Sequence, residues 1–329
     1  MLATRIPIFD QMKKLSIITP SYKSEQYLST YFENITSLVG FADYQIILIL
    51  NQPTQKELGI SAEYKKKYPD NINIVEVSLE SIGASTNRGF LLADTEFITC
   101  ADVDDIKKPD CFSRQMQTLE KHPEADVTFG DFMVVNKQGS TEGLLVKTPE
   151  FNKQDATRGS IVGPNHFFRK KLLEKCGLWD EQFKSGSDYD FQIREAFNAD
   201  FRRTGGGILL YYTRYEGSGS ASSSELQQIE RTVIELRYGI YDKINYSFLP
   251  KALEYDIYHI YYNGQKKHVS EFVPNYKELM EQRYKKYFKK GIRRNVYNIA
   301  ALEKAALGMK YFFKDPVWTY KKVIKKLKA

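Results

Sequence analysis

The stretch 98-ITCADVDDIKKPD-110 joins an apolar, strand-like run to three aspartates. Residues i and i+2 of an extended segment point the same way, so Asp102 and Asp104 can address one ligand. Hard divalent cations take oxygen ligands of this kind. An aspartate-rich turn before a helix is also a common helix cap, and Asp105 or Asp110 fits that role. The motif alone therefore predicts either a cation site or a helix cap.

Apolar runs alternate with polar or amphipathic segments on both sides of this motif. The predicted strands cover residues 14–20, 45–50, 72–77 and 97–101. This alternation predicts an α/β domain with a mostly parallel sheet flanked by helices. Such sheets bind ligands beyond the carboxyl ends of their strands. Three polar segments follow predicted strands and are expected to converge there: Pro20-Ser21-Tyr22, Asn51-Gln52 and Asp102-Val103-Asp104-Asp105.

The sequence changes character near residue 224. A glycine- and serine-rich stretch over residues 217–224 follows the last predicted strand. Apolar residues then recur at spacings of three and four from Leu226 to Ile240, which predicts an amphipathic helix. The remainder is rich in Tyr and Lys and is predicted to be helical. We therefore predict an α/β domain over residues 1–224 and a helical, basic C-terminal region over residues 225–329.

Charge is distributed unevenly between these two regions. Residues 225–329 hold 22 Lys and Arg against 11 Asp and Glu, whereas residues 1–224 hold 26 against 30. In the last helical segment, most lysines lie off the face formed by Val317, Tyr320, Ile324 and Leu327. Such a helix can lie on an anionic membrane surface. The alternatives are an ordinary solvated face over a small helical subdomain and a packing arm in a homo-oligomer. Nucleic acid is not expected as a partner, because no recognition motif accompanies the charge.

Cysteine usage and hydropathy exclude several classes of protein. Cys100, Cys111 and Cys176 are odd in number and lack the C-x-x-C spacing, which argues against a disulfide framework or a zinc site. No apolar run approaches the roughly 20 residues of a membrane-spanning helix. The N-terminus also lacks the apolar core of a signal peptide. The sequence therefore predicts a reducing, cytoplasmic compartment.

Five ordered elements resemble those of family 2 glycosyltransferases with the GT-A fold. They span about residues 14–224, and although each is weak alone, the ordered set is specific. The elements are Ile17-Ile18-Thr19-Pro20-Ser21-Tyr22, Asn87-Arg88-Gly89, Ala101-Asp102-Val103-Asp104-Asp105, Gly177-Leu178-Trp179-Asp180-Glu181-Gln182-Phe183 followed by Gly186-Ser187-Asp188-Tyr189-Asp190, and Tyr212-Thr213-Arg214-Tyr215-Glu216-Gly217-Ser218-Gly219-Ser220. The resemblance implies a Rossmann-like nucleotide-binding fold. It also implies inverting, metal-dependent sugar transfer from a nucleotide-sugar, with a UDP-sugar as first candidate, to a hydroxyl of a cell-surface glycan.

The resemblance implies roles for residues on the donor side. Those assigned to nucleotide-sugar binding are Pro20, Ser21, Tyr22, Asn51, Asn87, Asp102, Val103 and Asp104. Within this set, residues 20–22 would line the nucleobase pocket, Asp102 would approach the ribose, and Asp104 would bind Mn²⁺ or Mg²⁺. Glu216 stands where relatives often carry a His, so it is either a second metal ligand or a solvated loop residue.

On the acceptor side, the resemblance implies that Asp188 is the general base and that Trp179 lies near the acceptor sugar. A free Asp titrates near about 3.9, so Asp188 is a weak base unless its site raises the pKa. His166 precedes a predicted strand in the same half of the sequence and is a candidate acceptor contact. The expected acceptor is a glycan, with a lipid-linked glycan on the cytoplasmic face of the membrane as one form.

Three departures from the family pattern motivate an alternative. Asn51 stands where relatives carry an acidic residue that reads uracil, Ser187 where they carry Glu, and Thr86 where they carry Arg. The alternative is a degenerate, non-catalytic module that binds a nucleotide-sugar or a glycan. The two hypotheses differ in turnover, because only the enzyme releases a nucleoside diphosphate.

Overall fold

The computed structural model describes residues 13–214 and 225–291. The chain divides into two compact units, Met1–Tyr276 and Lys277–Ala329. Helix α10 (Tyr276–Gly291) is the element described for the second unit, and all other described helices and strands lie in the first. Glu216, one of the predicted metal ligands, lies outside the described residues.

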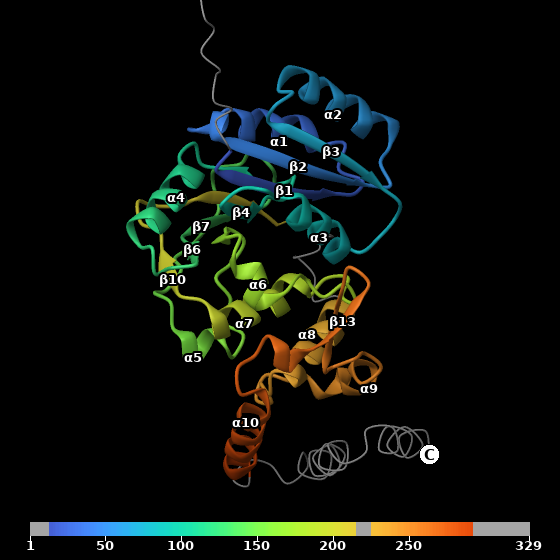
Figure 1. Cartoon of the computed structure of the whole chain (residues 1–329), viewed down its shortest axis with the longest axis vertical. Coiled ribbons are helices and arrows are strands. Elements are labelled where there is room, and N and C mark those ends of the chain that lie inside the picture. Colours follow the sequence, from blue (N-terminus) through green and yellow to red (C-terminus); the bar gives the residue numbers. More distant parts are fainter. Residues whose placement is uncertain (1–12, 215–224, 292–329) are drawn as a thin grey trace, which may run out of the picture. The chain divides into compact units, whose positions relative to one another are not determined.

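A seven-stranded sheet forms the centre of the first unit (Figure 1). Its strand order is β10-β6-β9-β4-β1-β2-β3, and all neighbours are parallel except the two pairs that β9 makes with β4 and β6. This confirms the predicted mostly parallel sheet. The strands are β1 (Leu15–Ser21), β2 (Tyr44–Asn51), β3 (Ile72–Val77), β4 (Phe97–Cys100), β6 (Val127–Phe129), β9 (Phe167–Arg169) and β10 (Phe201–Arg203).

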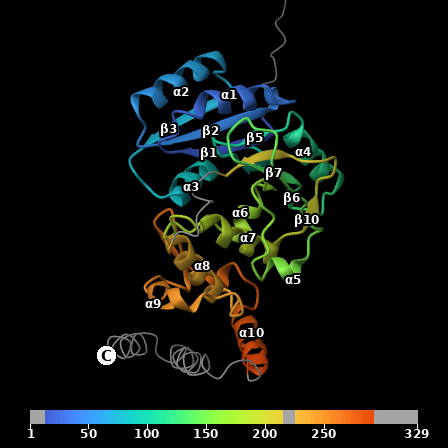
Figure 2. The same ribbon diagram turned by 180° about the vertical axis from the view of Figure 1, so that it is seen from behind.

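Helices cover both faces of this sheet, which explains why its strands are continuously apolar rather than alternating. In β2, Ile46, Leu48 and Leu50 pack toward α1, α2 and α4, whereas Ile47 and Ile49 pack toward α3 and α7. Figures 1 and 2 show α1 and α2 on one side of the sheet and α3 on the other. The α-helices described before residue 214 are α1 (Leu28–Thr36), α2 (Gln55–Lys67), α3 (Ile82–Leu92), α4 (Cys111–Lys121), α5 (Lys153–Ala156), α6 (Leu172–Cys176) and α7 (Ser187–Asn198).

A second, four-stranded sheet follows the order β5-β11-β7-β8. Its strands are β5 (Ile106–Lys107), β7 (Phe132–Val135), β8 (Leu144–Val146) and β11 (Leu210–Thr213). Strand β5 begins directly after Asp105 and pairs with β11. The loop of residues 101–105 therefore runs from the end of β4 in the large sheet to the first strand of the small one, and both ends of the loop are held by strand pairing.

The residues after 224 contain a β-hairpin where the sequence predicts only helix, so that part of the prediction is wrong. Strands β12 (His259–Tyr262) and β13 (Gln265–His268) pair across Asn263-Gly264, whose φ angles are 47° and 70°. Positive φ at both positions of a two-residue loop favours the Asn-Gly dipeptide and a tight hairpin. This first unit reaches Tyr276, beyond the predicted boundary at residue 224. Its other late elements are α8 (Glu225–Arg237), α9 (Leu249–Ala252) and the short 3-10 helices Tyr246–Phe248 and Val269–Glu271; a further one, Phe41–Asp43, precedes β2.

Within residues 13–214 and 225–291, no helix combines the length and the apolar character needed to cross a membrane.

Two helical glycines provide a matched test of packing in this fold. A Cβ atom on Gly89 of α3 would lie 2.3 Å from Cγ2 of Ile18 in β1, whereas a Cβ on Gly59 of α2 would meet nothing within 4 Å. We expect Gly89→Ala to lower the free energy of unfolding by about 1–3 kcal/mol through overpacking. Gly59→Ala should raise it by about 0.5–1 kcal/mol, because Ala favours a helix interior. Urea denaturation of both variants measures this, and equal effects would contradict the proposed contact.

Candidate active site

The carboxyl ends of β1, β2 and β4 lie at one edge of the large sheet. These strands are parallel neighbours, with Ser21 beside Leu50 and Ile18 beside Cys100. The amide of Ala101 donates to the carbonyl of Ile18 at 3.0 Å, so the acidic loop leaves the sheet directly beside β1. The polar segments that follow the three strands therefore share one edge, as the strand pattern predicts.

The three aspartates of the acidic loop have different surroundings. Asp102 is exposed, Asp104 is half-buried and Asp105 is buried. The Asp105 carboxylate accepts a hydrogen bond from the amide of Thr213 at 2.8 Å and lies 3.8 Å from the ammonium of Lys107. Helix α4 begins after Asp110, whose side chain makes no capping hydrogen bond. Asp105 is thus structural, but it holds β11 rather than capping a helix, and Asp102 and Asp104 remain available to a ligand.

Desolvation, with a contribution from neighbouring negative charge at Asp104, raises the pKa values of the aspartates in this loop. Burial and the nearby Asp102 charge raise the pKa of Asp104 to about 6, and Lys107 partly opposes this. Desolvation by the surrounding protein also raises the pKa of Asp102, and the charge of Lys107 lowers it. A divalent cation would relieve the repulsion between the two carboxylates. Within the part of the chain that is described, no group of three or more His, Cys, Asp or Glu could hold a metal ion. The loop fits the way Mg²⁺ and Mn²⁺ bind through one or two carboxylates plus substrate phosphates.

Asp188 lies at the start of helix α7, one residue after Ser187. It retains solvent contact, and its Oδ1 accepts a hydrogen bond from the amide of Tyr189 at 2.8 Å. Desolvation by the surrounding protein and, to a lesser extent, the charge of Asp102 raise the pKa of Asp188 to about 6, while the hydrogen bond from the Tyr189 amide and the charge of His166 oppose this. The charges of Asp188 and Asp102 therefore interact, although the two residues are far apart in the sequence.

His166 is buried near Asp188, and it is paired with a residue that the sequence did not indicate as functional. Its Nε2 lies 2.6 Å from Oε2 of Glu195, and its ring stacks on Phe168 with centroids 4.9 Å apart. Glu195 is completely buried and stands seven positions after Asp188 on α7. Seven residues are nearly two helical turns, so both carboxylates lie on one face of the helix. That spacing is the only sequence signal that could have suggested Glu195.

Asn87 and Trp179, predicted for opposite sides of the reaction, are in direct contact. The Asn87 amide donates to the carbonyl of Trp179 at 2.9 Å and accepts from its N–H at 2.8 Å. The Trp179 ring packs edge-on against Phe90, with centroids 6.0 Å apart. Asn87 is buried, so its amide fixes the backbone that carries Trp179.

The remaining residues predicted to bind the donor differ in their burial and in their hydrogen bonds. The Asn51 amide donates to the Glu80 carbonyl and to Ser85, and it accepts from the Glu80 N–H at 3.1 Å. Asn51 therefore closes the loop that enters α3. Tyr22 is 44% exposed, whereas Pro20 is half-buried and Val103 is buried with its carbonyl accepting from Gln138. The hydroxyl of Ser21 is buried without a hydrogen-bond partner.

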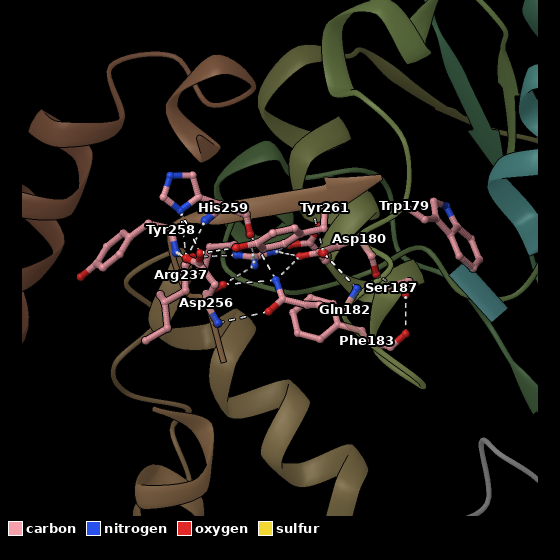
Figure 3. A network of polar contacts seen from close by, with 12 residues as sticks. Trp179, Asp180, Gln182, Phe183, Ser187, Arg237, Asp256, Tyr258, His259 and Tyr261 are labelled. Atoms are coloured by element: carbon pink, nitrogen blue, oxygen red, sulfur yellow. Dashed lines mark hydrogen bonds and ion pairs between the residues drawn. The ribbon is translucent and has the colours of Figure 1, made fainter. Parts of the chain in front are cut away.

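A fully buried ionic network anchors helix α7, and the sequence did not predict it; Figure 3 shows the part of it around Arg237 and Asp180. The guanidinium of Arg237 on α8 lies 2.9 Å from the carboxylate of Asp180 and 2.6 Å from that of Asp190. Asp190 also pairs with Arg194 at 2.8 Å and accepts from the hydroxyl of Tyr238 at 2.8 Å. Buried charges persist only when they are paired in this way. The network fixes the first turn of α7, where Asp188 stands.

A cavity of about 500 Å³ lies beside the β12–β13 hairpin, and none of the residues that line it belongs to the acidic loop. It is lined by Gln182, Glu254, Tyr255, Asp256 and Tyr261. The Asp256 carboxylate already accepts from the hydroxyl of Tyr261 at 2.6 Å and pairs with Lys266 at 3.0 Å. These contacts hold the hairpin to Asp256, and the amide of Tyr261 donates to Asp180 at 3.1 Å while the Gln182 amide donates to the carbonyl of His259 at 3.1 Å.

Comparison with known proteins identifies the family. Residues 16–177 match the model of the family described as Glycosyl transferase family 2. The chain is 28% identical over 191 residues to a poly(ribitol-phosphate) beta-glucosyltransferase of Bacillus spizizenii, covering 56% of this chain and 30% of that protein. It is 23% identical over 216 residues to the poly(ribitol-phosphate) beta-N-acetylglucosaminyltransferase TarS of Staphylococcus aureus, covering 64% of this chain and 38% of TarS. The chain thus spans about a third of the length of these two relatives.

The solved structures agree with this result at the level of the fold. The structure of S. aureus TarS 1-349 in complex with UDP aligns with a TM-score of 0.56 and 20% identity, covering 74% of this chain and 72% of that one. The complex of the same fragment with UDP-GlcNAc aligns with a TM-score of 0.55 and 19% identity, covering 73% of this chain and 79% of that one. The chain belongs to the family 2 glycosyltransferases and has the GT-A fold.

Proposed function

We propose that the chain is an inverting glycosyltransferase that moves a sugar from a nucleotide-sugar, with a UDP-sugar as first candidate, to a hydroxyl of a cell-surface polymer. One observation carries this proposal. The acidic loop with Asp102 leaves β4 beside β1, and the residue before Asp188 packs on the first turn of α3, where a Cβ on Gly83 would lie 2.9 Å from Oγ of Ser187. Although Asp102 and Asp188 are distant in sequence, the charge of Asp102 contributes to the raised pKa of Asp188. A donor site and an acceptor base must lie close together for a single displacement to occur.

On the donor side, Asp104 would hold Mn²⁺ or Mg²⁺ together with the diphosphate, and Asp102 would approach the ribose. When bound, the cation supplies positive charge that stabilises the departing diphosphate. The accessible ring of Tyr22 and the unpartnered hydroxyl of Ser21 support a nucleobase site at the end of β1. Asn51 and Asn87 would act indirectly, because their amides hold the backbone of Glu80 and Trp179.

On the acceptor side, a carboxylate oxygen of Asp188 would accept the proton of the attacking hydroxyl. A bond then forms between that hydroxyl oxygen and the anomeric carbon while the bond from this carbon to the diphosphate breaks on the opposite face. The raised pKa of Asp188, about 6, makes it a stronger base than a free Asp at neutral pH. Trp179 and His166 are proposed to border the acceptor.

The names of the relatives support an anionic acceptor. Two of them act on poly(ribitol-phosphate), as their names state. Residues 225–329 carry twice as many basic as acidic side chains, which suits a phosphate polymer or an anionic membrane surface. We propose that this basic region draws the enzyme to the acceptor on the cytoplasmic face of the membrane, with a role in homo-oligomer packing as the alternative.

A donor screen tests the proposed function. The whole chain is incubated with UDP-, GDP- and dTDP-sugars, Mn²⁺ and a ribitol-phosphate polymer, and nucleoside diphosphate release is measured. We expect acceptor-dependent release with one class of donor and loss of release on chelation. An unchanged rate on chelation would refute the metal role of Asp104. Calorimetric binding of a donor without any release would favour the non-catalytic module.

The transfer rate is expected to depend on pH through Asp188. A base works only when it is deprotonated, so the rate should fall as the pH drops through about 6, by about tenfold for each further unit. Single-turnover rates measured between about pH 4.5 and 8 with saturating donor and cation test this. A rate that stays level down to about pH 4.5, as a base with the free Asp value of about 3.9 would give, would contradict the role of the local surroundings.

A further inference from the structure

Glu230 of helix α8 binds the loop that precedes the proposed base. Its side chain is completely buried. One carboxylate oxygen accepts from the amide of Lys184 at 2.8 Å, and the other accepts from the amides of Ser185 and Gly186 at 2.8 and 3.0 Å. These three residues run directly into the first turn of α7, where Asp188 stands.

This carboxylate also lies at the N-terminal end of α7. The residue before α7 is Gly186, which has no side chain to cap the helix. Glu230 binds the N–H of Gly186 and those of the two residues before it, so its charge stands beside the helix N-terminus. A negative charge in this position interacts favourably with the helix dipole. Glu230 therefore provides this charge from a different helix.

Helix α8 also binds α7 beyond Asp188. Arg237 lies seven positions after Glu230, nearly two turns along the same face of α8, and pairs with Asp190 at 2.6 Å. A Cβ on Gly186 would lie 2.9 Å from Cδ1 of Ile234, so α8 packs closely against the loop between these two contacts. The backbone of Asp188 is therefore held two residues before it, through Gly186, and two residues after it.

We propose that Glu230 is a positioning residue for sugar transfer, which fixes residues 184–186 so that the Asp188 carboxylate faces the acceptor hydroxyl. This inference rests on the proposed function, in which Asp188 is the base. Glu230 has no access to substrate, so it acts on the reaction only through the backbone of this loop. Donor binding and loss of diphosphate occur at the acidic loop, which Glu230 does not contact.

The substitution Glu230→Gln tests the proposal, with Glu235→Gln as its matched control. Gln keeps the length of the side chain but replaces one acceptor oxygen by an NH₂ group, which cannot accept from a backbone N–H. Glu235 is also completely buried on α8, but its carboxylate pairs with Arg231 at 2.9 Å instead of binding the loop. The control therefore removes a buried charge from the same helix and leaves the loop contacts intact.

In the whole chain, Glu230→Gln should speed amide hydrogen exchange of residues 184–187 by about tenfold. It should lower kcat for transfer by about 100-fold, because small displacements of a reacting group are costly. The KM for the donor and the slow hydrolysis of the donor without acceptor should stay as in the wild type. Glu235→Gln should change neither exchange nor kcat by more than about threefold.

Two results would overturn the proposal: wild-type exchange and kcat in Glu230→Gln, or equal losses in both variants, which would indicate loss of stability alone. Should Glu230→Gln not fold, Glu230→Asp keeps the charge but shortens the reach, and the same loop-specific changes are expected from it. Hydrogen exchange is independent of activity. If the wild type transfers no sugar but Glu230→Gln still shows faster exchange of residues 184–187, the loop contact is supported and the proposed function is refuted.

Discussion

Asp188→Asn is expected to reduce sugar transfer by about 100- to 10,000-fold, the usual contribution of a general base. Asn has nearly the shape of Asp and can still accept the hydrogen bond from Tyr189, so the first turn of α7 should remain in place. What it cannot do is accept the proton of the acceptor hydroxyl at neutral pH. The measurement is kcat for transfer to the polymer acceptor, with the donor that the screen identifies.

The control for this variant is Asp94→Asn. Asp94 is exposed, precedes β4 at the opposite edge of the sheet, and accepts a hydrogen bond from Gln45. Its substitution should leave transfer unchanged. Asp188→Asn should also keep the donor KM and the binding of the nucleotide. Full transfer activity in Asp188→Asn would show that the base is another group.

The central sheet could be predicted because its local signals agree with its tertiary environment. Strand β2 is apolar at every position from Ile46 to Leu50, and the structure buries both of its faces. Helix α2 carries a complete capping box, with Thr54 and Glu57 each bonded to the backbone of the other. Where a local pattern and the three-dimensional packing demand the same residue types, the sequence alone is sufficient.

The hairpin of residues 259–268 was missed for a different reason. Its tyrosines and lysines suit an amphipathic helix as well as a strand, so side-chain pattern favoured neither. The decisive signal was the dipeptide Asn263-Gly264, which accommodates two positive φ angles. This turn signal involves two residues only, whereas the Tyr- and Lys-rich composition of the whole C-terminal region favours helix.

The partners of the site residues could not be predicted, because they depend on contacts between distant segments. Asp105 resembles a helix cap in sequence, but its partner is the amide of Thr213, 108 positions away. His166 could be recognised as a candidate, whereas its contact with Glu195 follows from the packing of α7 on β9. Residue type limits the chemistry that is available to a side chain, and only the fold determines which partner completes it.

The second large effect is expected from Arg237→Met, which should lower the free energy of unfolding by about 3–5 kcal/mol, the range for removing one member of a buried ion pair. The guanidinium of Arg237 neutralises Asp180 and Asp190 and donates to the carbonyl of Ile257 at 2.8 Å, ahead of the β12–β13 hairpin. Met fills a similar volume, so the loss would come from the buried carboxylates rather than from a cavity: Asp180 would lose its cation, and Asp190 would keep only Arg194.

Arg202→Met is the control, because it makes the same substitution at an ion pair between two exposed side chains. Arg202 and its partner Glu124 are 53% and 51% exposed and lie 3.2 Å apart, so the loss should be about 1 kcal/mol or less. Urea denaturation of the two variants gives the difference. Equal losses would mean that the buried network contributes no more than a surface pair. In that case Arg237 would not be what holds the first turn of α7, and the contacts of Glu230 with residues 184–186 would be left to position Asp188.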